Sequence, residues 1–484
     1  MARTISRSNL ASFPLIAFAA LIAGAMAARS TQLAVAATLL LLLFAIRQES
    51  RSAGLATLWV YWLLIPMVRR VIDLVSAAPS ADPLSLLPFV ATALLALMEL
   101  RENRLSRRAR TILALAAIGF LIGVPVGLSI DPVAMSFAAV AYVAGLSAFV
   151  LGWGDEVRPA FSSTLEQVLK VVLVPLALYG IAQYFFPLTS WDDNWVTSTD
   201  LGSIMAPQKG HIRVFSTLNS PFTFAIVLAV GILFVVAMRR RLNYKLLYLL
   251  PVSVALALTF VRSAWLSLVL GLIVYVAATK GRAAGKTVAV VLVCVAGLVV
   301  VGGSNPTTKA FTDRITSVGD PNDISSKERL ETTSRLLPQS IGQPLGAGLG
   351  QAGLAANLNE SSEAGVVDVD NGYVALLYQC GLLAFLMVIW AIVVSVGAAV
   401  RSLGRAPPEA RPYRAAILGI LVMLVVAEAS ADVLFGIPGV IFWYLAGLSV
   451  ASVAGDRLRE EKRGEEEDGG EPAINQLQPS AATP

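Results

Sequence analysis

Long apolar runs recur along almost the whole sequence and constrain its fold more than any other feature. Hydrophobic residues make up 56% of the 484 residues and charged residues only 14%. A single soluble core stops growing well below this chain length, so a soluble protein has no use for so much apolar surface. Many runs are long enough to cross a hydrocarbon layer of about 30 Å, and they are solid rather than alternating, which excludes a β-barrel. The sequence therefore predicts an all-α polytopic membrane protein.

The runs predict about fourteen spanning helices, within a range of about twelve to fourteen. The first run is interpreted as a span and not as a signal peptide, because another apolar run follows it directly. Together the spans are expected to form one helical bundle over residues 1–455. They are 13–28, 32–46, 55–68, 84–100, 111–128, 132–152, 165–186, 219–238, 244–259, 263–279, 287–303, 373–400, 413–429 and 433–454.

Clusters of Lys and Arg between the spans predict the orientation of the chain. With the N-terminus in the cytoplasm, every dense basic cluster falls on the cytoplasmic side, at 47–51, 101–110, 239–245, 280–286 and 401–414. Both termini are then cytoplasmic, and the charged tail 456–484 is expected to be disordered. The polar segment 187–213 becomes a first extracytoplasmic loop. Segment 304–370 becomes a large one, with a short helix from Ser325 to near Leu337.

The counts of other residue types exclude several function classes. The net charge of +5 comes from Arg clusters in short loops, which orient helices, so no nucleic-acid partner is expected. Both cysteines lie inside apolar runs, and His211 is the only histidine. We therefore predict no metal site and no cofactor.

Six arginines on the predicted outer side are candidates for binding an anionic group. A guanidinium at the membrane edge is costly unless something anionic pairs with it, and its planar fork fits phosphate oxygens. The alternative for each is an ion pair with a local carboxylate, or snorkelling toward the headgroups. Of the two on the loop helix, Arg329 is favoured because Arg335 falls on nearly the opposite face. The six are Arg69, Arg70, Arg213, Arg262, Arg329 and Arg335.

Acidic and aromatic residues on the same side offer further candidates. Asp370, where the large loop re-enters the membrane, could orient or deprotonate a hydroxyl, or the pair Asp370–Asn371 could simply cap the next helix. Glu428 and Asp432 are expected to face a cavity. Trp191 is either a sugar platform or an interfacial anchor.

Several stretches, in this order, resemble the O-antigen ligase and Wzy-type polysaccharide polymerase superfamily. They are RVFSTLNSPFTFA (213–225), LTFVRSAWLSLV (258–269), the long loop with DISSKERLETTSR (323–335) and PLGAGLG (344–350), and DNGYVALLYQCGLLAF (370–385). The stretch YGIAQYFFPLTSWDDNW (179–195) resembles the exopolysaccharide-polymerase branch.

The resemblance implies a metal-independent glycosyltransferase of the GT-C type in the bacterial inner membrane. Its donor would be an undecaprenyl-diphosphate-linked glycan and its acceptor a glycan or a lipid-linked unit, with polysaccharide-export machinery as a candidate partner. Arg213, Arg262 and Arg329 match motif positions that engage the diphosphate in the family. The stretch 370–385, where the chain returns from the large loop to the membrane, is called the return motif. Ligases carry a histidine at its start, where this chain has Asp370, and this difference favours a polymerase.

Two other functions remain open at this point. One is a ligase that transfers the glycan to a lipid or protein acceptor. The other is a flippase or transporter, which would place charged residues at span centres and would need no large outer loop.

Overall fold

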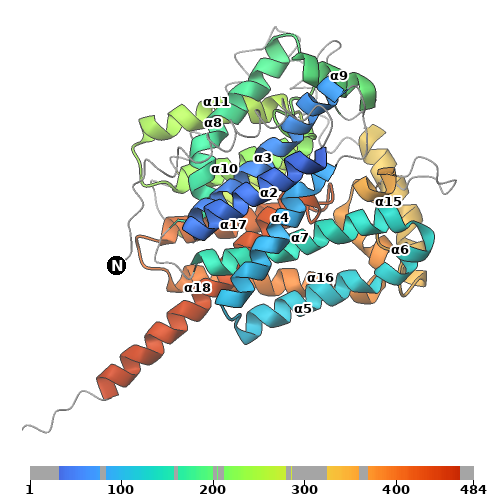
Figure 1. Ribbon diagram of the computed structural model, residues 1–484. Coiled ribbons are helices and arrows are strands. Elements are labelled where there is room, and N and C mark those ends of the chain that lie inside the picture. The colour runs from blue at the N-terminus through green and yellow to red at the C-terminus, as the bar shows by residue number, and fades with distance from the viewer. Residues whose placement is uncertain are drawn as a thin grey trace, which may run out of the picture.

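The computed structural model describes residues 32–76, 83–156, 162–199, 204, 212–279, 285, 324–358 and 369–468, and within these ranges the regular elements are helices (Figure 1). In chain order they are α2 (Gln32–Glu49), α3 (Arg51–Ser76), α4 (Pro83–Glu102), α5 (Arg107–Ile122), α6 (Val124–Ile130), α7 (Pro132–Glu156), α8 (Thr164–Phe185) and α9 (Ser190–Thr199). There follow α10 (Pro221–Ala237), α11 (Leu242–Leu258), α12 (Arg262–Thr279), α15 (Ile324–Gly342), the 3₁₀ helix η2 (Gly353–Leu358), α16 (Gly372–Arg405), α17 (Arg411–Ala427) and α18 (Gly436–Asp468).

Eight segments in these ranges are long and apolar enough to cross a membrane. They are Arg51–Val75, Leu84–Glu102, Arg107–Ile130, Pro132–Asp155, Thr164–Phe185, Arg262–Thr279, Gly372–Arg405 and Gly436–Gly455, and two shorter apolar helices are Pro221–Ala237 and Leu242–Leu258. The predicted class, a polytopic helical membrane protein, is confirmed, and each of these ten coincides with an expected span.

The other four expected spans are not among these ten segments. Two of them, 13–28 and 287–303, lie outside the described residues. The spans 32–46 and 413–429 coincide with α2 and α17, which are not among the spanning candidates. The figure of about fourteen therefore stays a prediction.

Polar residues mark where several of the apolar helices begin. Ser106, Ser163 and Ser220 are the N-caps of α5, α8 and α10, and each side chain accepts a hydrogen bond from an N–H of the first turn. Each cap satisfies one of the N–H groups that have no partner within the helix. In α10 the cap is followed by Pro221, whose fixed φ suits the first helical position.

Small residues let neighbouring helices approach closely, as expected where lipid supplies no hydrophobic drive between helices. In the pair α7 and α18, Gly152 lies against the backbone of Tyr444, and Gly447 lies against the backbone of Phe149. The two helices run in the same direction, since Tyr142 contacts Phe435 near their starts and Asp155 contacts Tyr444 farther along. In the pair α12 and α17, a Cβ on Gly271 would lie 2.8 Å from Gly419 O.

Successive helices alternate in direction, so the bundle has two chemically different ends. The "basic end" is where α2, α4 and α12 finish and α5, α8 and α17 begin. Arg47 there pairs with Glu99 and Glu102 at 3.5 and 3.4 Å, and Arg411 Nε donates to Ala278 O at 3.3 Å. The "motif end" is the opposite one, where α3, α8, α11 and α17 finish and α12 and α16 begin. In Figure 1, α6, α9 and α15 lie toward the right of the view, and α18 leaves the bundle at the lower left.

The segments predicted as loops and tail contain helices of their own. Segment 187–213 includes α9, and segment 304–370 includes α15 and η2. The loop helix is longer than expected, since α15 continues to Gly342 with Pro338 inside it. In the C-terminal region, α18 continues to Asp468, beyond the expected start of the tail at 456.

Candidate functional site

The segment 212–220, just before α10, is fastened to α8 at the motif end. Ser216 has a φ of 54°, a left-handed conformation that costs a non-glycine residue on the order of 1–3 kcal/mol. Its N–H donates to Gln183 Oε1 at 2.7 Å, and its hydroxyl donates to Leu176 O at 2.7 Å. Since both acceptors are on α8, that helix determines the conformation of the segment that carries Arg213.

A buried guanidinium holds the same segment against α3 and α9. Arg70 Nη1 donates to Asp192 Oδ1 at 2.6 Å and Nη2 donates to Ser216 O at 2.8 Å, with both charged side chains 0% exposed. The second carboxylate oxygen of Asp192 accepts from Tyr179 Oη at 2.7 Å and from Gln183 Nε2 at 2.8 Å. The sequence placed Arg70 at the outer rim as a ligand-binding arginine. In the structure its side chain has no exposed surface, so we assign it a positioning role.

Arg213 and Arg262 are brought to the same place by a short backbone connection. Val214 N donates to Leu258 O, at the end of α11, at 3.2 Å. Arg262 starts α12 four residues later, after a tight turn in which Phe260 has a φ of 53°. Both arginine side chains are half-buried. The two motifs that carry these arginines therefore meet at the motif end, as the sequence predicted from the shared side of the membrane.

The packing of α12 on α17 brings an acid to the level of Arg262. The helices are antiparallel, since Gly271 faces Gly419 and Arg411 reaches Ala278. Arg262 lies nine residues before Gly271, and Glu428 lies nine residues after Gly419. At a rise of about 1.5 Å per residue, both are about 13 Å from the glycine contact in the same direction.

The start of the return motif contacts Glu428 directly. Asn371 is the N-cap of α16, and its side chain accepts from two N–H groups of the first turn at 3.1 and 3.3 Å. Gly372 N donates to Glu428 O at 2.8 Å. Asp370, one residue before the cap, is exposed. Capping thus falls to Asn371, and Asp370 lies exposed at the motif end.

Glu428 and Asp432 form an acidic pair between α17 and α18, with Glu428 buried and Asp432 half-buried. Glu428 is 2% exposed, and its Oε2 accepts from Val433 N at 2.7 Å and from Leu434 N at 3.1 Å. Burial raises the pKa of Asp432 to about 6, and Asp432 Oδ2 accepts from Tyr142 Oη at 3.2 Å.

The glycine-rich turn 344–350 is a packing element. It sits where α16 is broken at Gly381, whose φ is 80°. Three N–H groups of the turn donate to Tyr378 and Gln379 of α16, at 2.7, 3.0 and 2.8 Å. These N–H groups are engaged within the protein, so the turn has a structural role.

Helix α15 lies over the start of α16. Leu336 is buried in a small cluster with Val374 and Ala375, on the first turn of α16. Arg335, next to Leu336, is exposed. The backbone of Arg329 belongs to α15, and its side chain lies outside the described residues. The packing of α15 on α16 carries both arginines to the region of the return motif.

Comparison with known protein families matches part of the chain. Residues 247–389 match the family model described as O-antigen ligase. The chain carries an O-antigen ligase domain. The match supports the resemblance of its motifs to that superfamily. No curated protein matches the chain in sequence.

The O-antigen ligase domain contains four of the predicted site residues. These are Arg262, Arg329, Arg335 and Asp370. Arg213 and Glu428 lie outside the matched segment, yet each adjoins it through a backbone hydrogen bond, Val214 N to Leu258 O and Gly372 N to Glu428 O. The helices on either side of the domain thus complete the motif end.

Two further predicted residues, Arg69 and Trp191, lie near the segment 212–220 that carries Arg213. Arg69 Nε is 3.5 Å from Asp73 Oδ2, one turn along α3. Trp191 is half-buried, and its Nε1 donates to Tyr179 Oη at 3.1 Å. Contact of either residue with a ligand stays a prediction, and His211 lies outside the described residues.

Sequence reasoning did not single out Gln183 or Tyr142. Gln183 bonds Asp192 and the backbone of Ser216, and Tyr142 bonds Asp432. The available signal for Gln183 was a polar amide inside an otherwise apolar span, since such residues in a membrane usually find a protein partner.

Proposed function

We propose that the protein is a membrane glycosyltransferase of the GT-C type that polymerises lipid-diphosphate-linked oligosaccharide repeat units. The product would be a cell-surface polysaccharide or exopolysaccharide, made on the outer face of the bacterial inner membrane from an undecaprenyl-diphosphate-linked donor. One observation carries the proposal. Arg213 and Arg262 meet through the Val214–Leu258 hydrogen bond at the same end of the bundle as Asp370 and Glu428, and the O-antigen ligase domain supplies much of that end.

In the proposed reaction the arginines and Asp370 have different roles. An acceptor hydroxyl oxygen forms a bond to the anomeric carbon of the donor glycan, and the bond from that carbon to the diphosphate oxygen breaks. The diphosphate leaves with the bonding electrons, and the guanidinium groups of Arg213, Arg262 and Arg329 stabilise the charge that builds on it. Asp370 accepts or orients the proton of the acceptor hydroxyl. No metal is required for these steps.

The choice of polymerase over ligase depends on the return motif. Asp370 stands where ligases of the superfamily have a histidine. Because a diphosphate is a good leaving group, a carboxylate suffices to position the hydroxyl. The second candidate is a ligase that transfers the glycan to a lipid or protein acceptor, and the description of the matched family favours it.

The test is a reconstituted assay with defined lipid-linked repeat units. Arg262→Ala and Arg329→Ala should each abolish polymer without changing protein amount. Removal of a single donor from a charge-stabilising site typically costs about 10²–10³ in rate. Arg239→Ala is the matched control, because Arg239 is an exposed arginine beyond the other end of α10.

Polymer of normal length from both Arg262→Ala and Arg329→Ala would refute the assignment. The product distinguishes the two enzyme candidates. A polymerase extends one lipid-linked unit with another and gives a ladder on the carrier lipid. A ligase gives glycan transfer only when a separate acceptor is supplied.

A further inference from the structure

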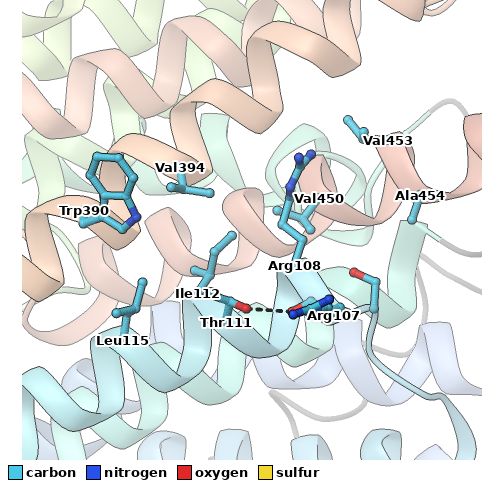
Figure 2. A pocket seen from close by; sticks show the side chains of 11 residues that line it. Arg107, Arg108, Thr111, Ile112, Leu115, Trp390, Val394, Val450, Val453 and Ala454 are labelled. Atoms are coloured by element: carbon cyan, nitrogen blue, oxygen red, sulfur yellow. Dashed lines mark hydrogen bonds between the residues drawn. The ribbon is translucent and has the colours of Figure 1, made fainter.

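A pocket of about 630 Å³ opens at the basic end of the bundle, away from the motif end. It lies between α5, α16 and α18, and Figure 2 shows its wall. Arg107 and Arg108, on the first turn of α5, line one part, and Val450 of α18 lies beside Arg108. Trp390 of α16 lies at the other end of the pocket and is 59% exposed.

The wall of the pocket changes character with depth. Leu115 lies seven residues after Arg108 on α5, about 10 Å farther from the basic end. Gly119 of α5 lies against Val388 of α16, and Gly123 lies against Gln379, so the two helices are antiparallel and Trp390 of α16 comes near the level of Leu115. The pocket is therefore basic at the bundle end and apolar toward the middle. This polarity matches an amphiphile with an anionic head and a hydrocarbon tail.

The charges around the pocket favour an external anion. The first turn of α5 contains no acidic residue, and the N-terminal end of a helix is itself positive, which makes two arginines there unfavourable without an anion. Two carboxylates at this end have other partners. Glu102 pairs with Arg47, and Asp155 accepts from Thr164. Among the described side chains, no ion pair is made by Arg107 or Arg108.

We propose that this pocket binds an anionic phospholipid of the bilayer leaflet at the basic end. Arg107 and Arg108 hold the headgroup phosphate, and one acyl chain lies along Leu115 and Trp390. Basic pockets between spanning helices are the sites where acidic lipid headgroups bind. The site is separate from the proposed glycan chemistry, because Arg213 and Arg262 lie at the other end of the bundle.

Native mass spectrometry of the full-length protein tests the headgroup preference. Phosphatidylglycerol should bind more tightly than phosphatidylcholine with the same acyl chains. Arg107→Gln and Arg108→Gln should each weaken phosphatidylglycerol binding about fivefold, and the double variant about 25-fold, because a basic side chain near an acidic lipid contributes roughly 1 kcal/mol. Arg110→Gln is the matched control, since Arg110 is an exposed arginine of the same turn that does not line the pocket.

Tryptophan quenching tests the position of the acyl chain. Phosphatidylglycerol brominated in its acyl chains should quench a fluorescence component that is absent in Trp390→Phe, and Arg107→Gln/Arg108→Gln should reduce that quenching. Equal binding of the two lipids, unchanged affinity in the double arginine variant, or quenching that does not depend on Trp390 would overturn the proposal. Complete displacement of the lipid by inorganic phosphate would also overturn it, because the site would then recognise a soluble anion.

Discussion

Replacement of Arg70 by methionine tests whether this arginine positions the site or binds the substrate. The change removes the guanidinium that donates to Asp192 Oδ1 at 2.6 Å and leaves a carboxylate that is 0% exposed. Tyr179 and Gln183 still donate to Oδ2, at 2.7 and 2.8 Å, yet no cation remains to balance the buried charge. Breaking a buried pair in this way typically costs about 3–5 kcal/mol.

Two further losses accompany the change and have the same sign. The guanidinium carbon of Arg70 lies 4.9 Å from the Phe215 ring centre and 5.5 Å from that of Trp195, within cation–π range. The hydrogen bond to Ser216 O at 2.8 Å is also lost. The segment carrying Arg213 then has fewer contacts that fix its strained conformation, so transferase activity should fall together with stability.

The measurement is thermal unfolding of purified full-length protein in detergent, made as a double-mutant cycle. Arg70→Met should be strongly destabilised. Adding Asp192→Asn to it should recover at least half of the loss, because removing both charges leaves none uncompensated. Arg69→Met is the matched control, and it should cost below about 1 kcal/mol, since the Arg69 side chain is 30% exposed in its pair with Asp73.

A stable but inactive Arg70→Met protein would refute the positioning role and would point to contact with the substrate. Additive losses in the double variant would refute the buried-charge argument, because they would show no coupling between Arg70 and Asp192.

Two other predictions concern the acidic pair beside the return motif. Gly372→Ala should destabilise by about 1–3 kcal/mol and reduce activity, because the new methyl group would meet the Glu428 carboxylate, whereas Gly397→Ala in the same helix meets only the Arg401 side chain, at 3.6 Å, and should be tolerated; unfolding temperatures of the two variants check this, and equal values would contradict it. The raised pKa of Asp432 means that the folded state binds a proton more tightly than the unfolded state, so wild-type protein should lose stability relative to Asp432→Asn as pH rises through about 6. Unfolding measured at pH values of about 4.5 and 7.5 tests this, and a pH-independent difference between the two proteins would contradict it.

The sequence contained most of the information on the membrane class and on the shared side of the arginines. Solid apolar runs identify spans without any knowledge of their neighbours, and alternating direction then puts Arg213 and Arg262 at one end. The contacts that fix the site were beyond such reasoning. Arg70 and Asp192 lie 122 residues apart in the chain, and neither residue carries a local signal of the other. The level of Glu428 relative to Arg262 depends on the helix pairing and could not be derived from residue order.

Because Gly419 of α17 contacts Gly271 of α12, the number of residues between Gly419 and Glu428 determines where Glu428 lies at the site. One residue inserted between Gly419 and Ala427 would move Glu428 about 1.5 Å along the helix axis and turn it by about 100° around it. Its carboxylate would then leave the face on which it meets Gly372. Length changes should therefore be excluded from this half of α17.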